Sequence, residues 1–292
     1  MGRVLKFAIA TCAALPDGFE DDQPLAEALG AEFAVWDSPE VDWDRFDRVI
    51  VRTPWDYTYN RDAFLEWADS RGERVQNRPE VLRWNSDKRY LADLAGAGLP
   101  VVPTEFVGPG DPLPQLDGEV VVKPTISAGA RDTGRFSACV HAGALSLVAR
   151  LREEDRIAMV QPYMPAVEAH GETAIVFFAG ELSHVLRKGA VLGPDEEAPI
   201  REGGIASAEA MWDPELVVAG EADAAERDLG RRVLEHVTER FGAPPLYARV
   251  DMLPGPDGAP ILLELEVVEP CLYLRTAPGS AERLASMVLA GA

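Results

Sequence analysis

Three acidic residues lie in apolar, strand-like sequence near the end of the chain. Asp251 belongs to the run 246–253, and Glu264 and Glu266 stand two residues apart in the run 260–267. Side chains two apart on a strand share a face, and a turn-linked partner strand can bring Asp251 beside them. Such carboxylates need a cation or basic partners, and a cluster of hard oxygen ligands is typical of magnesium sites. The competing interpretation is a half-exposed strand with a solvated acidic face.

Basic residues accompany these acids. Arg249 lies two residues before Asp251 and therefore on the same strand face, where it can neutralise the charge of a transferring phosphate. Lys123 ends the apolar run 119–123, and the small-residue loop 127–134 follows it. Backbone N–H groups of such loops can close over phosphates. The combination favours phosphate chemistry that uses a metal ion.

Two widespread nucleotide-binding patterns are missing from the sequence. The loop after Lys123 does not have the Walker spacing, and no Gly-x-Gly-x-x-Gly opens a helix after the first strand-like run. The P-loop and Rossmann interpretations therefore lose support.

Composition narrows the function classes. A chain of 292 residues is long enough for two or three domains, and its net charge of −21 opposes binding to nucleic acid or to an anionic membrane. The three cysteines are widely spaced, which argues against a disulfide framework and favours a reducing cytoplasm. No apolar run is long enough to span a bilayer. A signal peptide at 1–15 ranks below a buried first strand, because Lys6 interrupts its apolar stretch.

The first third of the chain alternates short apolar runs with helical patterns. This alternation predicts a small parallel sheet flanked by helices, with functional loops after the strands at 11–12 and 52–57. The segments concerned are 4–10, 24–29, 33–36, 48–52 and 61–68.

The remaining two thirds predict two further units. A helix over 86–97 precedes a connector, and strands at 119–123, 135–140 and 157–161 with a helix at 142–151 form a compact subdomain. The last unit begins with a predicted hairpin, whose strands are 173–179 and 182–188. A long helix over 214–241 and the two acidic strands come after it. The predicted fold class is α/β (α+β), with domains at 1–100, 101–163 and 164–292.

The order of these features resembles the ATP-grasp superfamily across nearly the whole chain. Lys88, in Asn-Ser-Asp-Lys, is similar to the first phosphate-binding lysine of that family, and Lys123 to the second. The loop 127–134 resembles the family's flexible lid, which implies nucleotide contacts from Ser127 and Gly129.

The resemblance also covers the adenine, ribose and metal positions. Gln161-Pro-Tyr163-Met164 is similar to the hinge segment that holds adenine, and Glu168 resembles the carboxylate that binds the ribose hydroxyls. The family's arginine and three metal ligands match Arg249, Asp251, Glu264 and Glu266. The third ligand is commonly asparagine in the family, so Glu266 adds a negative charge.

Within the superfamily, the chain looks most like the D-cycloserine-forming ligases, which close O-ureido-serine into a ring. This closer resemblance is carried by the segments 52–57, 77–79, 84–88 and 264–266. Peptide-forming members tend to carry a glycine-containing segment after the last motif, whereas this chain continues with Val-Val-Glu269-Pro. Its substrate end is therefore expected to differ from that of a dipeptide ligase.

The resemblance implies an ATP-dependent reaction with Mg²⁺ (or Mn²⁺). A small amino-acid-like carboxylate would attack the terminal phosphoryl group, with Arg249 and Lys123 as catalytic groups. A nitrogen nucleophile would capture the acyl phosphate, within the same molecule if the enzyme is a cyclase. The alternatives are ligation to a second amine, a kinase that stops at phosphorylation, and a non-catalytic ATP-binding sensor. A homo-oligomer is left open.

Four residues are candidates for substrate contact. Arg52 and Asp56 follow a predicted strand, where a substrate-facing loop belongs, although the same segment could simply be a helix entry. Arg201 lies in a polar loop and could reach phosphate or the substrate carboxylate, but an exposed loop arginine is equally compatible. Glu269 follows the metal motif and completes the set.

Overall fold

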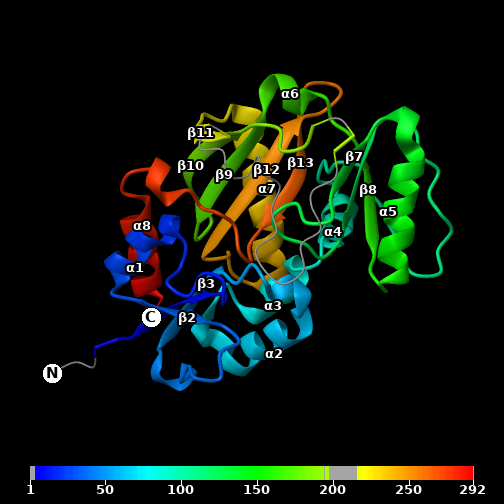
Figure 1. The fold of residues 1–292 in the computed structure, drawn as a ribbon. Coiled ribbons are helices and arrows are strands. Elements are labelled where there is room, and N and C mark those ends of the chain that lie inside the picture. The colour runs from blue at the N-terminus through cyan, green and yellow to red at the C-terminus, as the bar shows by residue number, and fades with distance from the viewer. Residues whose placement is uncertain (1–3, 194, 197–215, 292) are drawn as a thin grey trace.

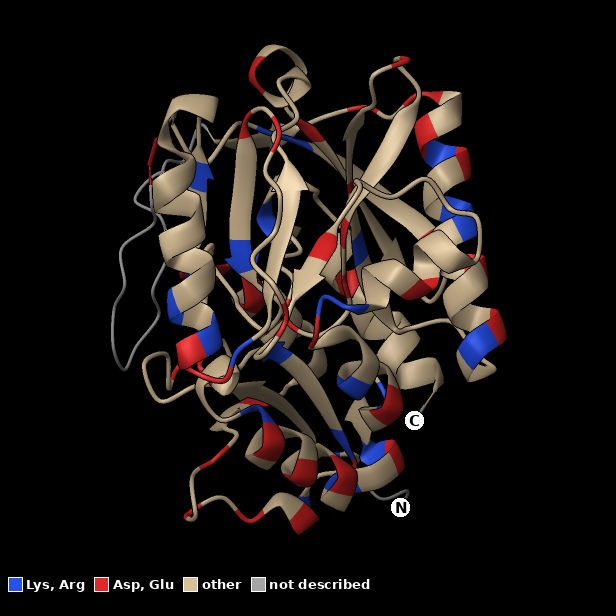
Figure 2. Cartoon of the chain, turned by 90° about the vertical axis from the view of Figure 1, so that its right-hand side faces the viewer, with Lys and Arg blue, Asp and Glu red and all other residues tan. Residues whose placement is uncertain are grey.

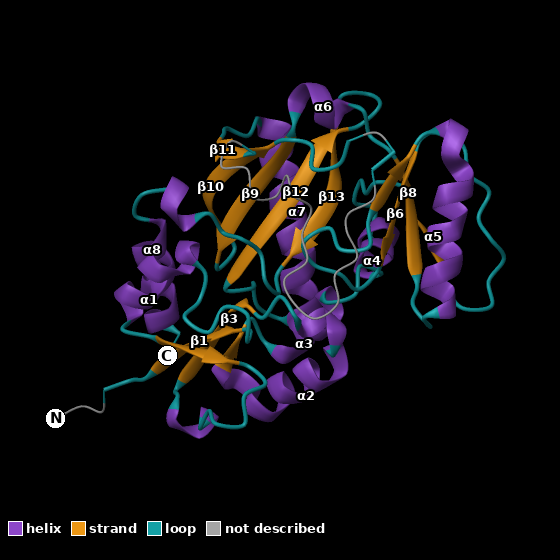
Figure 3. Ribbon diagram, in the orientation of Figure 1, coloured by secondary structure: helices purple, strands orange, loops and turns teal. Residues whose placement is uncertain are grey.

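A computed structural model describes residues 4–193, 195–196 and 216–291 of the chain. Each third of the chain contributes one sheet, and Figure 1 shows the first sheet below the long central sheet, with the middle third of the chain to one side. Figure 3 shows helices over the outer surfaces of all three sheets.

The first sheet confirms the predicted parallel arrangement. Its order is β2-β1-β3-β4, and every pairing is parallel. All five residues of β1 are buried, as expected for a parallel strand covered on both faces. The strands are β1 Phe7–Thr11, β2 Glu32–Val35, β3 Arg48–Thr53 and β4 Val75–Gln76, and the helices are α1 Gln23–Leu29, α2 Arg61–Arg71 and α3 Pro79–Asn85.

The link from the first sheet to the second differs from the prediction. The expected helix over 86–97 is wrong at its start, because α3 ends at Asn85 and the next helix, α4, is Tyr90–Gly96. Asp87 Oδ1 accepts the backbone N–H of Arg89, and the backbone N–H of Lys88 donates to Thr125 O at 2.8 Å. This turn attaches Lys88 to Thr125, the residue directly after the strand that carries Lys123.

The second sheet is antiparallel and has the order β5-β8-β6-β7. Helix α5, His141–Glu153, buries Ala144, Leu147 and Leu151 against it. The predicted strand over 135–140 is too long, because β7 ends at Phe136 and a 3-10 turn follows. The strands are β5 Glu105–Val107, β6 Val120–Pro124, β7 Gly134–Phe136 and β8 Ala158–Pro162.

The third sheet is the largest, with the order β11-β10-β9-β12-β13 and antiparallel pairing throughout. The predicted hairpin and the two acidic strands are confirmed. The elements are α6 Ala166–His170, β9 Glu172–Phe178, β10 Glu181–Lys188, β11 Val217–Ala219, α7 Ala224–Phe241, β12 Tyr247–Pro254 and β13 Pro260–Glu266.

The long helix begins later than predicted. Residues 217–219 form β11, and α7 starts at Ala224 because Asp223 and Glu226 form a reciprocal capping box. The first two residues of the predicted helix, 214–215, lie outside the described part.

The last helix, α8 Ser280–Ala290, packs against α1 (Figure 1). Leu284 belongs to a core that includes Ile9 and Leu25 near the first sheet, and Val176 and Tyr247 of the third. We keep the boundaries at residues 100 and 163 as a proposal. Each sheet lies within one of the three ranges, although α8 returns to the first.

Charges and cysteines fit a globular chain. Figure 2 shows acidic and basic residues interspersed along the outer helices and both signs on strands inside the molecule. All three cysteines are free, as their spacing predicts. None of the described helices combines the length and the apolar character needed to cross a bilayer.

Candidate active site

The two acidic strands pair as predicted. In the antiparallel register of β12 and β13, Asp251 lies opposite Glu264 and Arg249 lies opposite Glu266. All four residues line a cavity of about 360 Å³, within the usual range for small-ligand sites.

The same cavity gathers predicted nucleotide and substrate residues from all three thirds of the chain. Besides the four on β12 and β13, the predicted residues that line it are Lys88, Lys123, Ser127, Gly129, Gln161, Tyr163, Met164 and Glu269. The predicted residues Arg52, Asp56 and Glu168 do not line it, and Arg201 lies outside the described residues.

Two lysines from different elements meet one carboxylate. Lys88 Nζ lies 3.0 Å from Glu264 Oε1, and Lys123 Nζ lies 3.9 Å from Glu264 Oε2. Burial favours the neutral form of Glu264, but the charges of Lys88 and Lys123 outweigh it and lower the pKa to about 2. Burial in turn lowers the pKa of Lys123, and the charge of Lys88 acts in the same direction. The lysines are therefore held close to a fixed negative charge.

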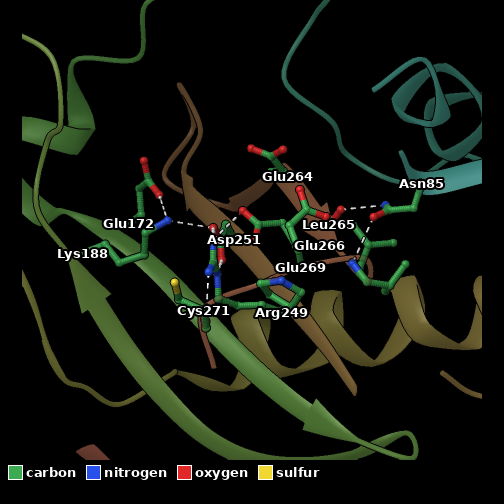
Figure 4. Close-up of polar contacts among 12 residues, drawn as sticks. Asn85, Glu172, Lys188, Arg249, Asp251, Glu264, Leu265, Glu266, Glu269 and Cys271 are labelled. Atoms are coloured by element: carbon green, nitrogen blue, oxygen red, sulfur yellow. Dashed lines mark hydrogen bonds and ion pairs between the residues drawn. The ribbon is translucent and has the colours of Figure 1, made fainter. Parts of the chain in front are cut away.

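A second cluster surrounds Asp251, which is 2% exposed. Arg249 Nε donates to Asp251 Oδ1 at 2.8 Å, and Lys188 Nζ donates to Asp251 Oδ2 at 2.7 Å (Figure 4). Burial alone would raise the pKa of Asp251, but Arg249 and Lys188 hold it well below its usual range. Lys188 also binds Glu172 at 2.9 Å, and Arg249 Nη2 binds Glu266 at 2.5 Å.

Sequence reasoning missed Lys188 and Glu172. Both lie at adjoining ends of a predicted hairpin, where Lys188 pairs with Glu172 across the strands. The available signal was a lysine at the end of a predicted strand, a feature that Lys188 shares with Lys123.

The carboxylates are engaged by these basic side chains rather than grouped around one point. Within the described residues, no group of three or more His, Cys, Asp or Glu side chains is arranged to hold a metal ion. The predicted metal centre is thus not preformed. The donor chemistry nevertheless fits a hard divalent cation, since Asp251 and Glu264 present carboxylates with lowered pKa values in one cavity.

The predicted adenine segment follows β8. Gln161 is buried and donates from Nε2 to Thr104 Oγ1 at 2.8 Å. Tyr163 carries the guanidinium of Arg135 over its ring at 3.5 Å. Glu168 is exposed, but it accepts from Tyr163 Oη at 3.0 Å and pairs with Arg135 at 2.8 Å. Arg135, a cavity residue that the sequence did not single out, thus links Glu168 to the cavity wall.

The predicted lid loop touches the first third of the chain. The guanidinium of Arg131 lies 4.0 Å from the centre of the Tyr59 ring, and both residues line the cavity. Arg131 is 6% exposed, yet its Nε and Nη1 atoms have no hydrogen-bond partner in the described structure. Buried donors of this kind are rare without a ligand or water.

Two predicted substrate residues have structural partners instead. Arg52 is 1% exposed and donates from Nε to Asp22 Oδ1 at 2.8 Å and from Nη2 to Pro270 O at 2.6 Å. Asp56 accepts from Trp36 Nε1 at 2.8 Å. Any effect of Arg52 on a ligand in the cavity must therefore pass through the segment that follows β13.

That segment, residues 269–272, is held by a side chain at every backbone carbonyl. The four donors come from β3, the loop after it, β12 and β10. They are Trp55 Nε1 to Glu269 O at 3.2 Å, Arg52 Nη2 to Pro270 O, Arg249 Nη1 to Cys271 O at 3.0 Å and His184 Nε2 to Leu272 O at 2.7 Å. Glu269 and Cys271 project into the cavity lining from this fixed segment.

Known proteins share this architecture. A family model described as "D-cycloserine synthetase DcsG, N-terminal domain" matches residues 7–77. The cycloserine biosynthesis protein DcsG of Streptomyces lavendulae is 35% identical over 283 residues, which cover 91% of each protein. The chain belongs to the DcsG family of ATP-grasp proteins. The crystal structure of D-cycloserine synthetase DcsG matches with a TM-score of 0.84 and 32% identity, covering 98% of this chain and 99% of that one.

More distant proteins extend the DcsG family likeness. The glutathione synthetase of Ralstonia nicotianae is 25% identical over 179 residues, 60% of this chain and 54% of that protein. The D-alanine–D-alanine ligase of Bacillus anthracis shares the fold, with a TM-score of 0.63 at 13% identity over 98% of this chain and 96% of that one. This member of the DcsG family is an ATP-dependent ligase that forms carbon–nitrogen bonds, not a non-catalytic sensor.

Proposed function

We propose that the chain activates the carboxylate of a small amino-acid-like molecule as an acyl phosphate and that a nitrogen of the same molecule then closes a ring. The likeness to DcsG, which is named for cycloserine biosynthesis, supports a cyclisation of this type. ATP would supply the phosphoryl group, and Mg²⁺ (or Mn²⁺) would accompany it.

One observation carries the proposal. Four cationic groups, Lys88, Lys123, Lys188 and Arg249, enter a single cavity and pair there with carboxylates. Buried cations at this density are what a triphosphate needs, because phosphoryl transfer is catalysed mainly by positioning and by neutralising charge.

The residues would act by exchanging partners. Lys88 and Lys123, which now face Glu264, would turn to phosphate oxygens, and the loop 127–134 would cover them with backbone N–H groups. Arg249, fixed by Asp251 and by Cys271 O, would stabilise the charge that develops on the transferred phosphoryl group. Gln161, Tyr163 and Met164 would hold the adenine and Glu168 the ribose.

Three carboxylates would hold the metal ion, and the two lysines would release one of them, Glu264. Asp251, Glu264 and Glu266 are the donors that this chain offers, and a bound Mg²⁺ would supply positive charge to neutralise the phosphates. Closure of the lid loop over the cavity would keep water from the acyl phosphate. Glu269 is the proposed substrate residue that reaches the cavity, with Arg52 acting behind it.

The test is turnover of O-ureido-serine in each configuration with MgATP. We expect ADP release that depends on the acid, together with a product lighter than the substrate by carbamic acid, observed by mass spectrometry. Ring closure expels phosphate from the acyl phosphate, and one water molecule then cleaves the ureido carbonyl from the ring nitrogen. Hydroxylamine should intercept the acyl phosphate as a hydroxamate. ADP release without any ligated product indicates a kinase. A product that appears only when a second amine is added indicates an intermolecular ligase. No acid-dependent ADP release from either enantiomer would refute the proposal.

Two variants and a control connect the chemistry to the cavity. Arg249→Lys and Lys123→Met should each lower kcat by roughly 100-fold or more, the loss that follows removal of a charge-stabilising donor. Glu181→Gln changes an exposed carboxylate at the start of β10 and should leave kcat unchanged.

A further inference from the structure

We propose that Arg135 is a positioning residue for the nucleotide, and that together with Tyr163 it holds Glu168 so that this carboxylate selects a ribose over a deoxyribose. The inference rests on the proposed function, because it concerns the nucleotide end of the same cavity. It assigns a role to a cavity-lining arginine that the proposed reaction does not use.

The guanidinium of Arg135 has a different partner at each of its nitrogens. Nε donates to Glu119 Oε1 at 2.7 Å, Nη2 pairs with Glu168 Oε1 at 2.8 Å, and Nη1 donates to Leu192 O at 3.3 Å. The guanidinium carbon lies 3.5 Å from the centre of the Tyr163 ring, and the residue is 5% exposed. A planar fork with three separate acceptors and a stacked ring is held in one orientation.

Glu168 is placed by this arginine and by Tyr163. It lies outside the cavity lining, and its side chain is 52% exposed. An exposed glutamate normally samples several rotamers, and ordering it when a ligand binds costs free energy. Tyr163 Oη donates to Glu168 Oε1 at 3.0 Å, and Arg135 reaches the same oxygen. Because both donors line the cavity, they attach the carboxylate to its wall.

The two donors meet at one oxygen of Glu168 and leave the other available. Among the described residues, none donates a hydrogen bond to Glu168 Oε2. The hydrogen bonds from Arg135 and Tyr163 lower the pKa of Glu168, so the carboxylate is ionised at neutral pH and can only accept. Burial and the bond to Glu168 raise the pKa of Tyr163 to about 12, so its hydroxyl keeps the proton that it donates. Oε2 is therefore an oriented acceptor without a donor.

A ribose hydroxyl is the group that suits this acceptor. Glu168 follows the segment 161–164, which is proposed to hold the adenine, and Tyr163 belongs to that segment. A 2′- or 3′-hydroxyl can donate to the carboxylate in a charge-assisted hydrogen bond, whereas a deoxyribose offers one donor fewer. The arrangement therefore favours ribonucleotides.

Arg135 joins Glu168 to two further segments of the site. Glu119 directly precedes β6, and its backbone carbonyl accepts the N–H of Tyr163 at 2.8 Å. Leu192 follows β10 and lines the cavity. A lysine at position 135 would keep the charge, but it has no planar fork for three acceptors in different directions. We therefore expect the positioning to require arginine.

The experiment compares nucleotides that differ in one ribose hydroxyl. Binding of ADP, 2′-deoxy-ADP and 3′-deoxy-ADP is measured by calorimetry with Mg²⁺ present. We expect ADP to bind about 10-fold or more tightly than at least one deoxy analogue, as for a hydrogen bond to a charged group. Arg135→Gln and Arg135→Lys should each reduce that preference to about threefold or less, because the carboxylate is no longer oriented. Tyr163→Phe keeps the ring beside the guanidinium and should reduce the preference in part.

Two controls distinguish positioning from general support of the fold. Arg152→Gln removes a half-buried arginine of α5, whose Nε donates to Gly108 O at 3.1 Å, and should leave the preference unchanged. In a Glu168→Ala protein, Arg135→Gln should cause no further loss of preference, because Arg135 acts through Glu168. Thermal unfolding shows which variants are folded. If Arg135→Gln does not fold, Arg135→Lys and Tyr163→Phe decide.

The outcomes separate the inference from the proposed function. Equal binding of the three nucleotides overturns the positioning role, even if the enzyme releases ADP with an acid substrate. The role is also overturned if Arg135→Gln weakens all three nucleotides by the same factor, since the arginine then supports only the fold of the wall. A ribose preference that depends on Arg135, in a protein that releases no ADP with any acid, upholds the inference and refutes the proposed reaction.

Discussion

Buried charges in the cavity are balanced residue by residue. Lys188 connects Asp251 and Glu172, which lie on different strands of the third sheet. Because each ion depends on the others for compensation, removal of one leaves an uncompensated charge. We therefore expect Lys188 to contribute to the stability of the fold as well as to phosphate binding.

Lys188→Met tests this dependence. We expect the free energy of unfolding to fall by about 3–5 kcal/mol, the cost of breaking a buried ion pair from one side. Urea unfolding at neutral pH provides the measurement, and Lys188→Arg should recover part of the loss. Arg231→Ala, which removes exposed ion pairs on α7, should leave the midpoint nearly unchanged. Equal effects of Lys188→Met and Arg231→Ala would contradict the expectation.

Glu269 gives the metal-free protein a characteristic pH dependence. Its pKa is raised from 4.5 to about 8 in the folded state, so the folded state binds more protons than the unfolded state between these values. Stability from this group is present in full below pH 4.5 and is lost as the pH rises through 8. At pH 8 in EDTA, Glu269→Gln should be more stable than the parent by on the order of a few kcal/mol.

Thermal unfolding of both proteins from pH 5 to 9 measures this effect. The advantage of Glu269→Gln should shrink toward pH 5, where the native carboxyl is protonated. Added Mg²⁺ should reduce the advantage at pH 8, because it neutralises nearby Glu266. A constant difference across the pH range would show that Glu269 does not titrate as expected.

The sequence predicted some site residues and missed others for a definite reason. Alternation within a strand and a short turn were enough to place Asp251 beside Glu264, because both cues are local. The pairing of Lys188 with Asp251, and of Arg135 with Glu168, joins elements far apart in the chain. Nothing local encodes it. Arg52 shows the reverse error, because its position after a strand suggested a ligand contact, whereas Asp22 and Pro270 occupy it.

At the scale of elements, the predicted order of strands and helices was largely correct and their ends were not. The start of α7 was misplaced because apolar spacing continues through β11, and only the capping box at Asp223 marks the true beginning. The helix expected over 86–97 is interrupted by a turn that attaches Lys88 to Thr125. Such tertiary hydrogen bonds override local propensity.

The contact between Arg131 and Tyr59 connects the lid loop to the first third of the chain. A double-mutant cycle with Arg131→Ala and Tyr59→Ala, read out as the affinity for ATP, should give a coupling energy of about 0.5–2 kcal/mol. Arg131→Ala alone should weaken ATP binding more than Tyr59→Ala does, because Arg131 lines the cavity and carries the positive charge. A coupling energy near zero would mean that the ring does not hold the guanidinium.

At the scale of the molecule, the first and third sheets share one core through α8 and α1. Leu284→Ala should cost about 2–5 kcal/mol, as for other buried leucines. Leu289→Ala, which alters a half-exposed position of the same helix, is the control and should stay within about 0.5 kcal/mol.

The shared core also predicts cooperative unfolding of the two sheets. Five of the six tryptophans lie between residues 36 and 84, so tryptophan fluorescence reports mainly on the first third of the chain. Far-UV circular dichroism reports on all helices and strands. The two transitions should coincide in urea, and separate midpoints would show that the first sheet unfolds independently of the third.

The clamped carbonyls of residues 269–272 have one more consequence. Residues 269–272 could move only if all four hydrogen bonds from distant parts of the chain broke together. We therefore expect this segment to be an immobile part of the cavity wall. We therefore expect ligands to enter and leave past residues 127–134, the predicted lid loop, which also lines the cavity. Slowing the movement of that loop alone should delay departure of products without altering which molecules are accepted.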